Sequence, residues 1–265
     1  MRTHLLKSFI EKLFGNVFWL EPSSDLGETQ KFIRQLVPVD IGIELIRVGP
    51  DGDGGYLVPD DLIGIGGCVS PGVSNEIRFD LEMAHRGIPV FMADASVKGP
   101  PENHELFHFY PKFLDVVDDA ESMRLETLVA EASKHGNGDL ILQMDIEGAE
   151  YQVLLDASDD VLRSFRIILL ECHHLTRLFG RQNSQIITAT FRKLLRHFYI
   201  VHIHPNNVRP PSSKGGIEIP PVMEFTFVRK DRARTEPKRG LVFPHQLDRN
   251  NLLDNPTVAL PEIWR

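Results

Sequence analysis

The stretch that decides the fold is residues 140–154, LILQMDIEGAEYQVL. Its first three residues are a short, continuous apolar run, which is typical of a strand that is buried on both faces. Asp145, Glu147 and Glu150 follow directly, and from Ala149 onward the apolar positions take helical spacing. In an open α/β sheet, ligands bind at the carboxyl ends of the strands. The stretch therefore predicts a strand, an acidic binding turn and a helix, in that order.

A simpler interpretation of the same acids is that they cap the helix that follows them. Carboxylates stabilise the first turn of a helix by interacting with its dipole. Three acids within residues 145–150 are more than one cap requires. We therefore favour a binding role for this turn over a purely structural one.

The composition is that of an ordinary globular chain, with 265 residues, 42% hydrophobic residues and 25% charged residues. A net charge of −8 argues against a dedicated nucleic-acid binder, because such proteins present a basic face. No stretch approaches the roughly 20 apolar residues of a membrane span, so we expect no transmembrane segment. The two cysteines, Cys68 and Cys172, form no CxxC motif. They are compatible with a reducing, cytoplasmic setting.

Strand-like and helix-like segments alternate along the chain. Strands are predicted at residues 66–72, 90–94, 113–117, 139–145, 166–171, 198–204 and 222–229, and helices at residues 28–36, 75–86, 121–134 and 186–197. Nothing helical lies between the last two strands, so we expect them to pair antiparallel. The pattern predicts an α/β fold with a doubly wound, Rossmann-like, mostly parallel seven-stranded sheet and a final antiparallel strand.

The chain is expected to have three parts. Residues 1–38 form an N-terminal helical segment, residues 39–232 the main domain, and residues 233–265 a C-terminal extension. Residues 1–20 carry apolar side chains at helical spacing, without the continuous apolar core and cleavage site of a signal peptide. We expect an amphipathic helix there, which together with a long late loop is compatible with a homo-oligomer.

Three of the predicted strands end on an acid, namely Asp94, Asp145 and Glu171. The carboxyl ends of parallel strands meet at one edge of a sheet, so these side chains are expected to converge there. Such a rim suits a polar ligand or a divalent cation. Asp94 also lies about 20 residues after the glycine turn at Gly72, the spacing at which a carboxylate binds ribose hydroxyls. The plainer alternative is that Asp94 only caps the next loop.

A second unusual stretch is residues 51–56, DGDGGY. Its glycines favour turns at positive φ. The alternatives are a plain hairpin loop and a loop that folds against a ligand.

Several of these stretches together resemble FkbM-type methyltransferases, which are class I, S-adenosylmethionine-dependent enzymes. The resemblance is carried by DGDGGY at 51–56, PGVSNE at 71–76, the strand ending on Asp94, DIEGAE at 145–150, HIHPNN at 202–207 and IPPVMEFT at 219–226. It spans roughly residues 45–230. It implies that Asp94 holds the ribose of S-adenosylmethionine and that the turn at residues 72–76 passes beneath its methionine and sugar. The residues expected to contact this cofactor are Asp53, Gly54, Gly72, Ser74, Glu76, Asp94 and Asp145.

The resemblance also implies O-methylation of a hydroxyl on a sugar, a glycan or another small secondary metabolite. A hydroxyl is a poor nucleophile and needs a general base or a metal ion. In one route, Asp145, Glu171 and His173 hold Mg²⁺. In the other, a side chain removes the proton directly. The candidates for that base are Asp145, Glu147, His173, His174 and His204.

Two other functions fit the same fold class. A nicotinamide-dependent oxidoreductase would need a Gly-x-Gly-x-x-Gly run after its first strand, and the chain has none there. A catalytically inactive Rossmann module would keep the cofactor site without turnover. Binding of S-adenosylmethionine, binding of NAD and methyl transfer separate the three.

Overall fold

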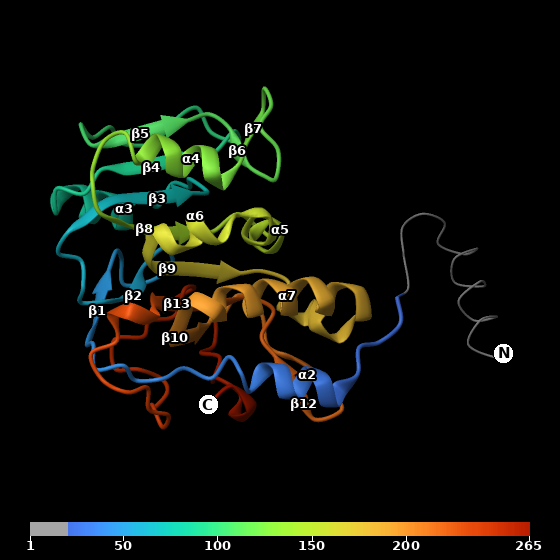
Figure 1. The fold of residues 1–265 in the computed structure, drawn as a ribbon. Coiled ribbons are helices and arrows are strands. Elements are labelled where there is room, and N and C mark those ends of the chain that lie inside the picture. Colours follow the sequence, from blue (N-terminus) through green and yellow to red (C-terminus); the bar gives the residue numbers. More distant parts are fainter. Residues whose placement is uncertain (1–20) are drawn as a thin grey trace.

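The architecture is a seven-stranded sheet with helices packed on it, in a computed structural model that describes residues 21–265 (Figure 1). The strands lie in the order β10-β13-β9-β8-β3-β4-β5. Their bounds are Ile65–Pro71 for β3, Val90–Ala93 for β4, Phe107–Tyr110 for β5, Asp139–Met144 for β8, Phe165–Cys172 for β9, Phe198–Pro205 for β10 and Met223–Arg229 for β13. β13 runs antiparallel to both of its neighbours, whereas the other pairings are parallel. The predicted mostly parallel sheet with a final antiparallel strand is confirmed.

The side chains of each buried strand alternate between the two faces of the sheet, so a core cluster forms on each face. On β3, for example, Val69 packs into the larger core cluster, whereas Cys68 packs into a second one on the opposite face. The larger cluster includes side chains of α2 (Leu26–Ile33), α4 (Leu125–Ala132), α5 (Glu150–Asp156), α6 (Asp159–Ser164) and α7 (Arg181–His197). The second cluster includes α3 (Arg78–His85) and the hairpin β1 (Leu45–Val48) and β2 (Tyr56–Pro59). None of the helices between residues 21 and 265 is long and apolar enough to cross a membrane.

The DGDGGY stretch forms the connection of this β1–β2 hairpin, so the plain hairpin interpretation describes its backbone correctly. Hydrogen bonds of Gln143, which lies in β8, anchor the hairpin to the sheet. The amide of Gln143 donates to the Tyr56 hydroxyl over 3.1 Å, and the Ser70 hydroxyl donates to the Gln143 carbonyl over 2.8 Å. This buried chain of hydrogen bonds fixes β2, β8 and β3 relative to one another.

One predicted strand was misplaced. The sheet strand after β4 is β5, at residues 107–110, and the prediction of a sheet strand at residues 113–117 is wrong. Phe113 and Leu114 instead form β6, which pairs in parallel with β7 (Ser122–Met123) as a separate two-stranded sheet. That pairing also delays the next helix to Leu125, because residues 122–123 are extended. The FHFY sequence of β5 alternates aromatic rings with a half-buried histidine, which masked its strand character.

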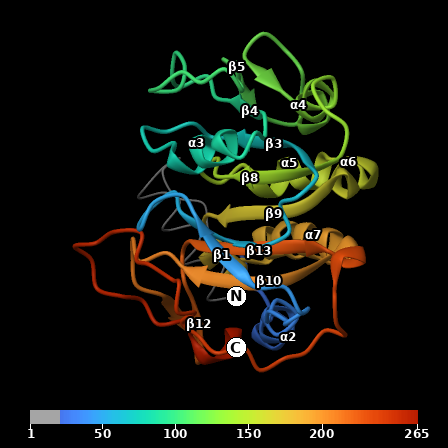
Figure 2. The same ribbon diagram turned by 90° about the vertical axis from the view of Figure 1, so that its left-hand side faces the viewer.

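The C-terminal extension folds back on the β10 edge of the sheet (Figure 2). The indole of the buried Trp264 donates a hydrogen bond to the Glu218 carbonyl in β12 (Ile217–Ile219), which pairs with β11 (Ser212–Lys214). The remaining short helices are η2 (Leu175–Phe179), η3 (Lys230–Arg232) and η4 (Glu262–Trp264). The predicted helix at residues 1–20 lies outside the described residues, and the three-part division of the chain stays a prediction.

Candidate functional site

The acidic turn after β8 is held in an unusual backbone conformation. Glu147 has φ 56° and Gly148 has φ 110°, so two consecutive residues adopt left-handed conformations. Such a conformation is uncommon for a glutamate and costs on the order of 1 kcal/mol. The turn is stabilised by Glu150, the first residue of α5. Its Oε1 accepts hydrogen bonds from the Ile146 and Gly148 amides over 3.3 and 3.0 Å. Glu150 therefore fixes the loop that presents Asp145 and Glu147.

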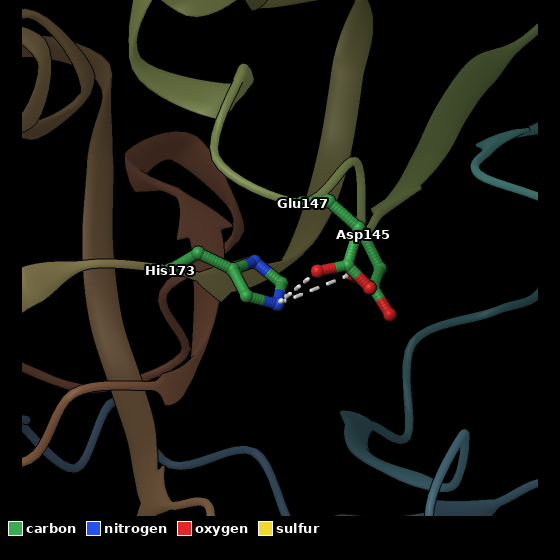
Figure 3. Close-up of side chains that lie close together, drawn as sticks. All are labelled: Asp145, Glu147 and His173. Carbon is green, nitrogen blue, oxygen red and sulfur yellow. Dashed lines mark ion pairs between the residues drawn. The ribbon is translucent and has the colours of Figure 1, made fainter. Parts of the chain in front are cut away.

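Glu150 also orients His173, which follows directly after β9. Nδ1 of His173 lies 2.9 Å from Oε1 of Glu150, whose side chain is fully buried. A carboxylate accepts at this position, so Nδ1 carries the proton and Nε2 has a free lone pair in the neutral ring. Nε2 lies 3.5 Å from Oε2 of Glu147 and 3.8 Å from Oδ1 of Asp145 (Figure 3). Of the three strand-end acids predicted to converge at this rim, Asp145 belongs to this cluster, together with Glu147 and His173.

Burial sets the electrostatics of this cluster. It raises the pKa of Asp145 to about 7, against the opposing charge of His173, and the neighbouring Glu147 and Glu150 raise it further. Burial alone would lower the pKa of His173, but the hydrogen bond and charge of Glu150 and the charge of Asp145 outweigh that effect and raise it. Oδ1 of Asp145 is buried and has no hydrogen-bond partner in the part of the chain that the structure describes. The cluster is therefore a polar site with unsatisfied binding capacity.

Glu171 lies at the same rim but has a different partner. Its Oε1 is 3.9 Å from Nε2 of His173 and accepts a hydrogen bond from the Asn206 amide over 3.0 Å. Burial and the charges of Asp145 and Glu224 raise its pKa well above the usual value. Asp145 and Glu171 thus lie 3.8 and 3.9 Å from Nε2 of His173, and Glu171 has the Asn206 side-chain amide as an additional hydrogen-bond partner. The close group of potential ligand atoms is Asp145, Glu147 and His173, with all atoms within 4.8 Å of one another.

A cavity of about 470 Å³ adjoins this cluster at the carboxyl ends of β3, β4 and β8. Its lining includes five residues from the predictions, namely Gly72, Ser74, Asp94, Asp145 and Glu147. The two carboxylate oxygens of Asp94 accept hydrogen bonds from the Val73 and Ser96 amides over 2.9 and 2.6 Å. Asp94 therefore does cap its loop, as the plainer alternative supposed, and at the same time it borders the cavity.

Gly72 brings β3 and β8 into close contact at the floor of this cavity. Its φ is +91°, and a Cβ atom there would lie 1.7 Å from the Asp145 carbonyl oxygen. Any larger residue would push the acidic turn away. The need for glycine at this position is therefore steric as well as conformational.

Other predicted residues lie outside the lining of this cavity. Asp53, in the β1–β2 connection, accepts a hydrogen bond from the Asn251 side chain over 3.2 Å. Gly54 packs against Glu76, where a Cβ would lie 2.9 Å from its Cγ, and Glu76 is paired with Arg78. The β1–β2 connection thus contacts the C-terminal extension and the loop before α3. The sequence could not show these contacts, because they join segments far apart in the chain.

The two remaining histidine candidates differ in their surroundings. The ring of His174 packs against Gly148, and burial lowers its pKa. Nδ1 of His204 lies 3.6 Å from Oδ2 of Asp248, whose Oδ1 is 2.9 Å from Nε2 of His202. The HIHPNN stretch therefore binds the C-terminal extension through both of its histidines.

Sequence reasoning gave no role to Glu224, although an acid within an apolar strand was a visible signal. The strand register pairs His204 with Glu224 and Glu224 with Glu171. Residues that face each other across a ladder share a face, so these side chains form a buried polar row leading away from the rim. The Asn251 amide donates to Glu224 over 2.7 Å, which covers the row with the C-terminal extension.

The comparison with protein families agrees with this geometry. The family model described as methyltransferase FkbM domain matches residues 74–199. This range contains β4, β5, β8 and β9, the acidic turn and His173. No curated protein matches the chain significantly. Residues 74–199 are therefore identified as a methyltransferase FkbM domain, in agreement with the resemblance seen in the sequence.

Proposed function

We propose that this protein transfers a methyl group from S-adenosylmethionine to a hydroxyl oxygen of a small acceptor, such as a sugar, a glycan or another secondary metabolite. The observation that carries the proposal is the position of Asp145. It lines the 470 Å³ cavity and also belongs to the cluster with Glu147 and His173. A cofactor site and a proton-accepting group thus adjoin each other at one rim.

The residues around the cavity fit S-adenosylmethionine. Asp94 is held in place by two amide donors, and a carboxylate keeps lone pairs for the hydroxyls of a ribose. The backbone at Gly72 lets the chain pass close to a ligand without a side chain in the way. S-adenosylmethionine, when bound, supplies an electrophilic methyl group on a positively charged sulfonium. Asp145 and Glu147 present negative charge to that side of the cavity.

The proton of the acceptor hydroxyl must leave during methyl transfer. Nε2 of His173 is suited to accept it, because Glu150 fixes the ring and leaves this nitrogen facing the cluster. Asp145, whose pKa of about 7 is raised by burial, is the alternative base. An acid with this pKa exchanges protons near neutral pH, which is where general-base catalysis is efficient.

Mg²⁺ assistance is the second route for activating the hydroxyl. Asp145, Glu147 and His173 would hold the ion, with Glu171 beside them. A bound divalent ion favours the alkoxide form of a hydroxyl. This ligand set replaces the predicted one, in which Glu171 took the place of Glu147.

The cysteines bear on the compartment in which the enzyme works, and the groups at the rim bear on its acceptor. Cys68 and Cys172 are both free and buried, which supports a reducing compartment such as the cytoplasm. For the acceptor we infer a small molecule or carbohydrate with free hydroxyls, because Asp145, Glu147 and His173 supply acceptors for hydroxyl protons at the rim.

Calorimetric titration with S-adenosylmethionine and with NAD tests the cofactor assignment. We expect binding of S-adenosylmethionine only, and a loss of about tenfold to a hundredfold in affinity for Asp94→Ala, because charge-assisted hydrogen bonds are each about 1.5–3 kcal/mol. The matched control is Asp254→Ala, at an exposed position on the C-terminal extension. Preferential binding of NAD would overturn the cofactor assignment. Transfer of a tritiated methyl group to a panel of sugars then separates an enzyme from an inactive module.

A further inference from the structure

The Asp145–Glu147–His173 cluster contains a nitrogen ligand as well as two carboxylates, and this composition bears on which cation it would bind. Nε2 of His173 lies within 3.8 Å of an oxygen of each acid. Mg²⁺ prefers oxygen ligands and keeps most of its water, whereas imidazole suits first-row transition metals. The donor set of this cluster therefore differs from that of an ordinary Mg²⁺ site.

Glu150 supplies the hydrogen-bond acceptor that a metal-binding histidine needs for its second ring nitrogen. A histidine that binds a metal through one nitrogen almost always donates the other N–H to a carboxylate or carbonyl, which fixes its tautomer and orientation. Nδ1 of His173 has such a partner in Oε1 of Glu150, a carboxylate with no exposed surface. The same oxygen accepts the Gly148 amide and so fixes the turn that carries the acids.

Among the residues that the structure describes, two atoms in the cluster, Oδ1 of Asp145 and Nε2 of His173, lack the hydrogen-bond partner that a purely structural ion pair would provide. Oδ1 of Asp145 is buried without a hydrogen bond among residues 21–265. His173 is only 9% exposed, and the contacts of its Nε2 with Asp145 and Glu147 are too long for hydrogen bonds. A cation between these atoms would satisfy both of them. The carboxylate of Glu147, an exposed side chain, lies on the same side of the His173 ring as Asp145 (Figure 3).

We infer that Asp145, Glu147 and His173 form a site for a divalent first-row transition metal, with Glu150 as the residue that positions His173. The site is expected to bind Mn²⁺ and the other first-row divalent metals, from Fe²⁺ to Zn²⁺, more tightly than Mg²⁺. This inference rests on the proposed function for its role, since the ion would face the acceptor hydroxyl. Its test needs no methyl transfer.

Mn²⁺ is the most stringent probe, because it binds most weakly among the first-row divalent metals from manganese to zinc at a given site. The full-length protein, freed of metal with chelator, is titrated with Mn²⁺ while the signal of the free ion is followed by electron paramagnetic resonance. We expect one bound Mn²⁺ per chain and at least tenfold weaker competition by Mg²⁺. Pulsed measurements are expected to show coupling to one imidazole nitrogen.

Two variants locate the site. His173→Gln is expected to abolish Mn²⁺ binding and, with it, the nitrogen coupling. Glu150→Gln is expected to weaken Mn²⁺ binding about 10- to 100-fold, which is the usual effect of removing the hydrogen-bond partner of a metal ligand. Glu218→Gln and His85→Gln change exposed side chains away from the rim and are the matched controls. Circular dichroism and thermal unfolding show whether each variant is folded.

Absence of stoichiometric Mn²⁺ binding by the wild-type chain would overturn the inference, and so would wild-type binding by His173→Gln or equal affinity for Mg²⁺. None of these results touches the cofactor proposal. Conversely, failure to bind S-adenosylmethionine with normal Mn²⁺ binding would remove the proposed function and leave the metal site standing.

Discussion

At the scale of single residues, Asp145 connects the two halves of the site. Its backbone carbonyl packs on Gly72, its side chain borders the cavity, and its Oδ1 faces His173. Burial and the surrounding acids raise its pKa, so its charge depends on what binds beside it. Few other positions in the chain affect both the shape and the charge of the rim.

Asp145→Asn keeps the size of the side chain and removes its charge and its ability to accept a proton. We expect methyl transfer to fall at least 100-fold, the usual contribution of a general base. Affinity for S-adenosylmethionine should fall much less, because Asp94 and the backbone at Gly72 are unchanged. Steady-state kinetics with Asp254→Asn as control measures this. Full activity of Asp145→Asn would show that the chemistry occurs elsewhere.

Gly72 offers a second test at the residue scale, because steric and conformational effects can be separated. At Gly72 an added Cβ meets the Asp145 carbonyl at 1.7 Å, whereas at Gly87, with φ +78°, it meets nothing within 4 Å. Gly87→Ala should therefore cost only about 1 kcal/mol of strain, and Gly72→Ala several times more. Gly99→Ala, with free space and no positive φ, should leave the free energy of unfolding unchanged. Denaturant unfolding of the three variants checks this order, and similar values for Gly72→Ala and Gly87→Ala would contradict it.

At the scale of elements, α3 carries a buried acid on the face that packs against β3. Asp80 is 7% exposed, its Oδ1 has no hydrogen-bond partner within the described part of the chain, and burial raises its pKa to about 7. The folded state therefore holds a proton that the unfolded chain releases near pH 4. The helix is consequently bound to the sheet most strongly when this acid is neutral.

This predicts a particular pH dependence of stability. The contribution of Asp80 is fully favourable below the unfolded pKa and is lost as the pH rises toward 7. Asp80→Asn should therefore raise the free energy of unfolding at pH 8 by up to about 4 kcal/mol and have little effect at pH 4. Urea unfolding at both pH values measures it. The exposed Asp160→Asn is the control, and equal effects of Asp80→Asn at both values would disprove the assignment.

At the scale of the whole molecule, the C-terminal extension is held by polar side chains from the carboxyl end of the sheet. His202 binds Asp248, and Asn207 donates to the carbonyls of Leu252, Asn255 and Pro256. The Asn207 side-chain oxygen also accepts the Leu252 amide over 2.8 Å. Asn251 in turn contacts Asp53 and Glu224. The extension thus joins the β1–β2 hairpin to the edge of the sheet.

Asn207→Ala removes the central residue of this attachment. Several buried partners lose their hydrogen bonds, so we expect a loss of about 2–4 kcal/mol in local or global stability. Limited proteolysis should then cut residues 245–257 faster than in the wild type. Asn103→Ala, at an exposed position, is the control. Unchanged cleavage in Asn207→Ala would mean that other contacts suffice to hold the extension.

Much of the sheet was predictable because its strands are marked by local patterns. Short apolar runs that end on an acid located β4, β8 and β9, and the lack of a helix between the last two strands gave their antiparallel pairing. β5 was missed because its side chains are half-buried and mixed in polarity. The positions of Asp94, Asp145 and Glu171 at the ends of their strands were also predictable, because the carboxyl ends of parallel strands lie at one edge of a sheet.

The sequence by itself determined the fold class and the FkbM domain at residues 74–199, because both depend on periodicities and motifs formed by neighbouring residues. Only the tertiary structure decided that Glu150 holds His173, that Asn206 binds Glu171, and that His204 binds Asp248. Each of these pairs joins segments separated along the chain. Strand order and register bring them within hydrogen-bond distance, and no local pattern encodes that distance.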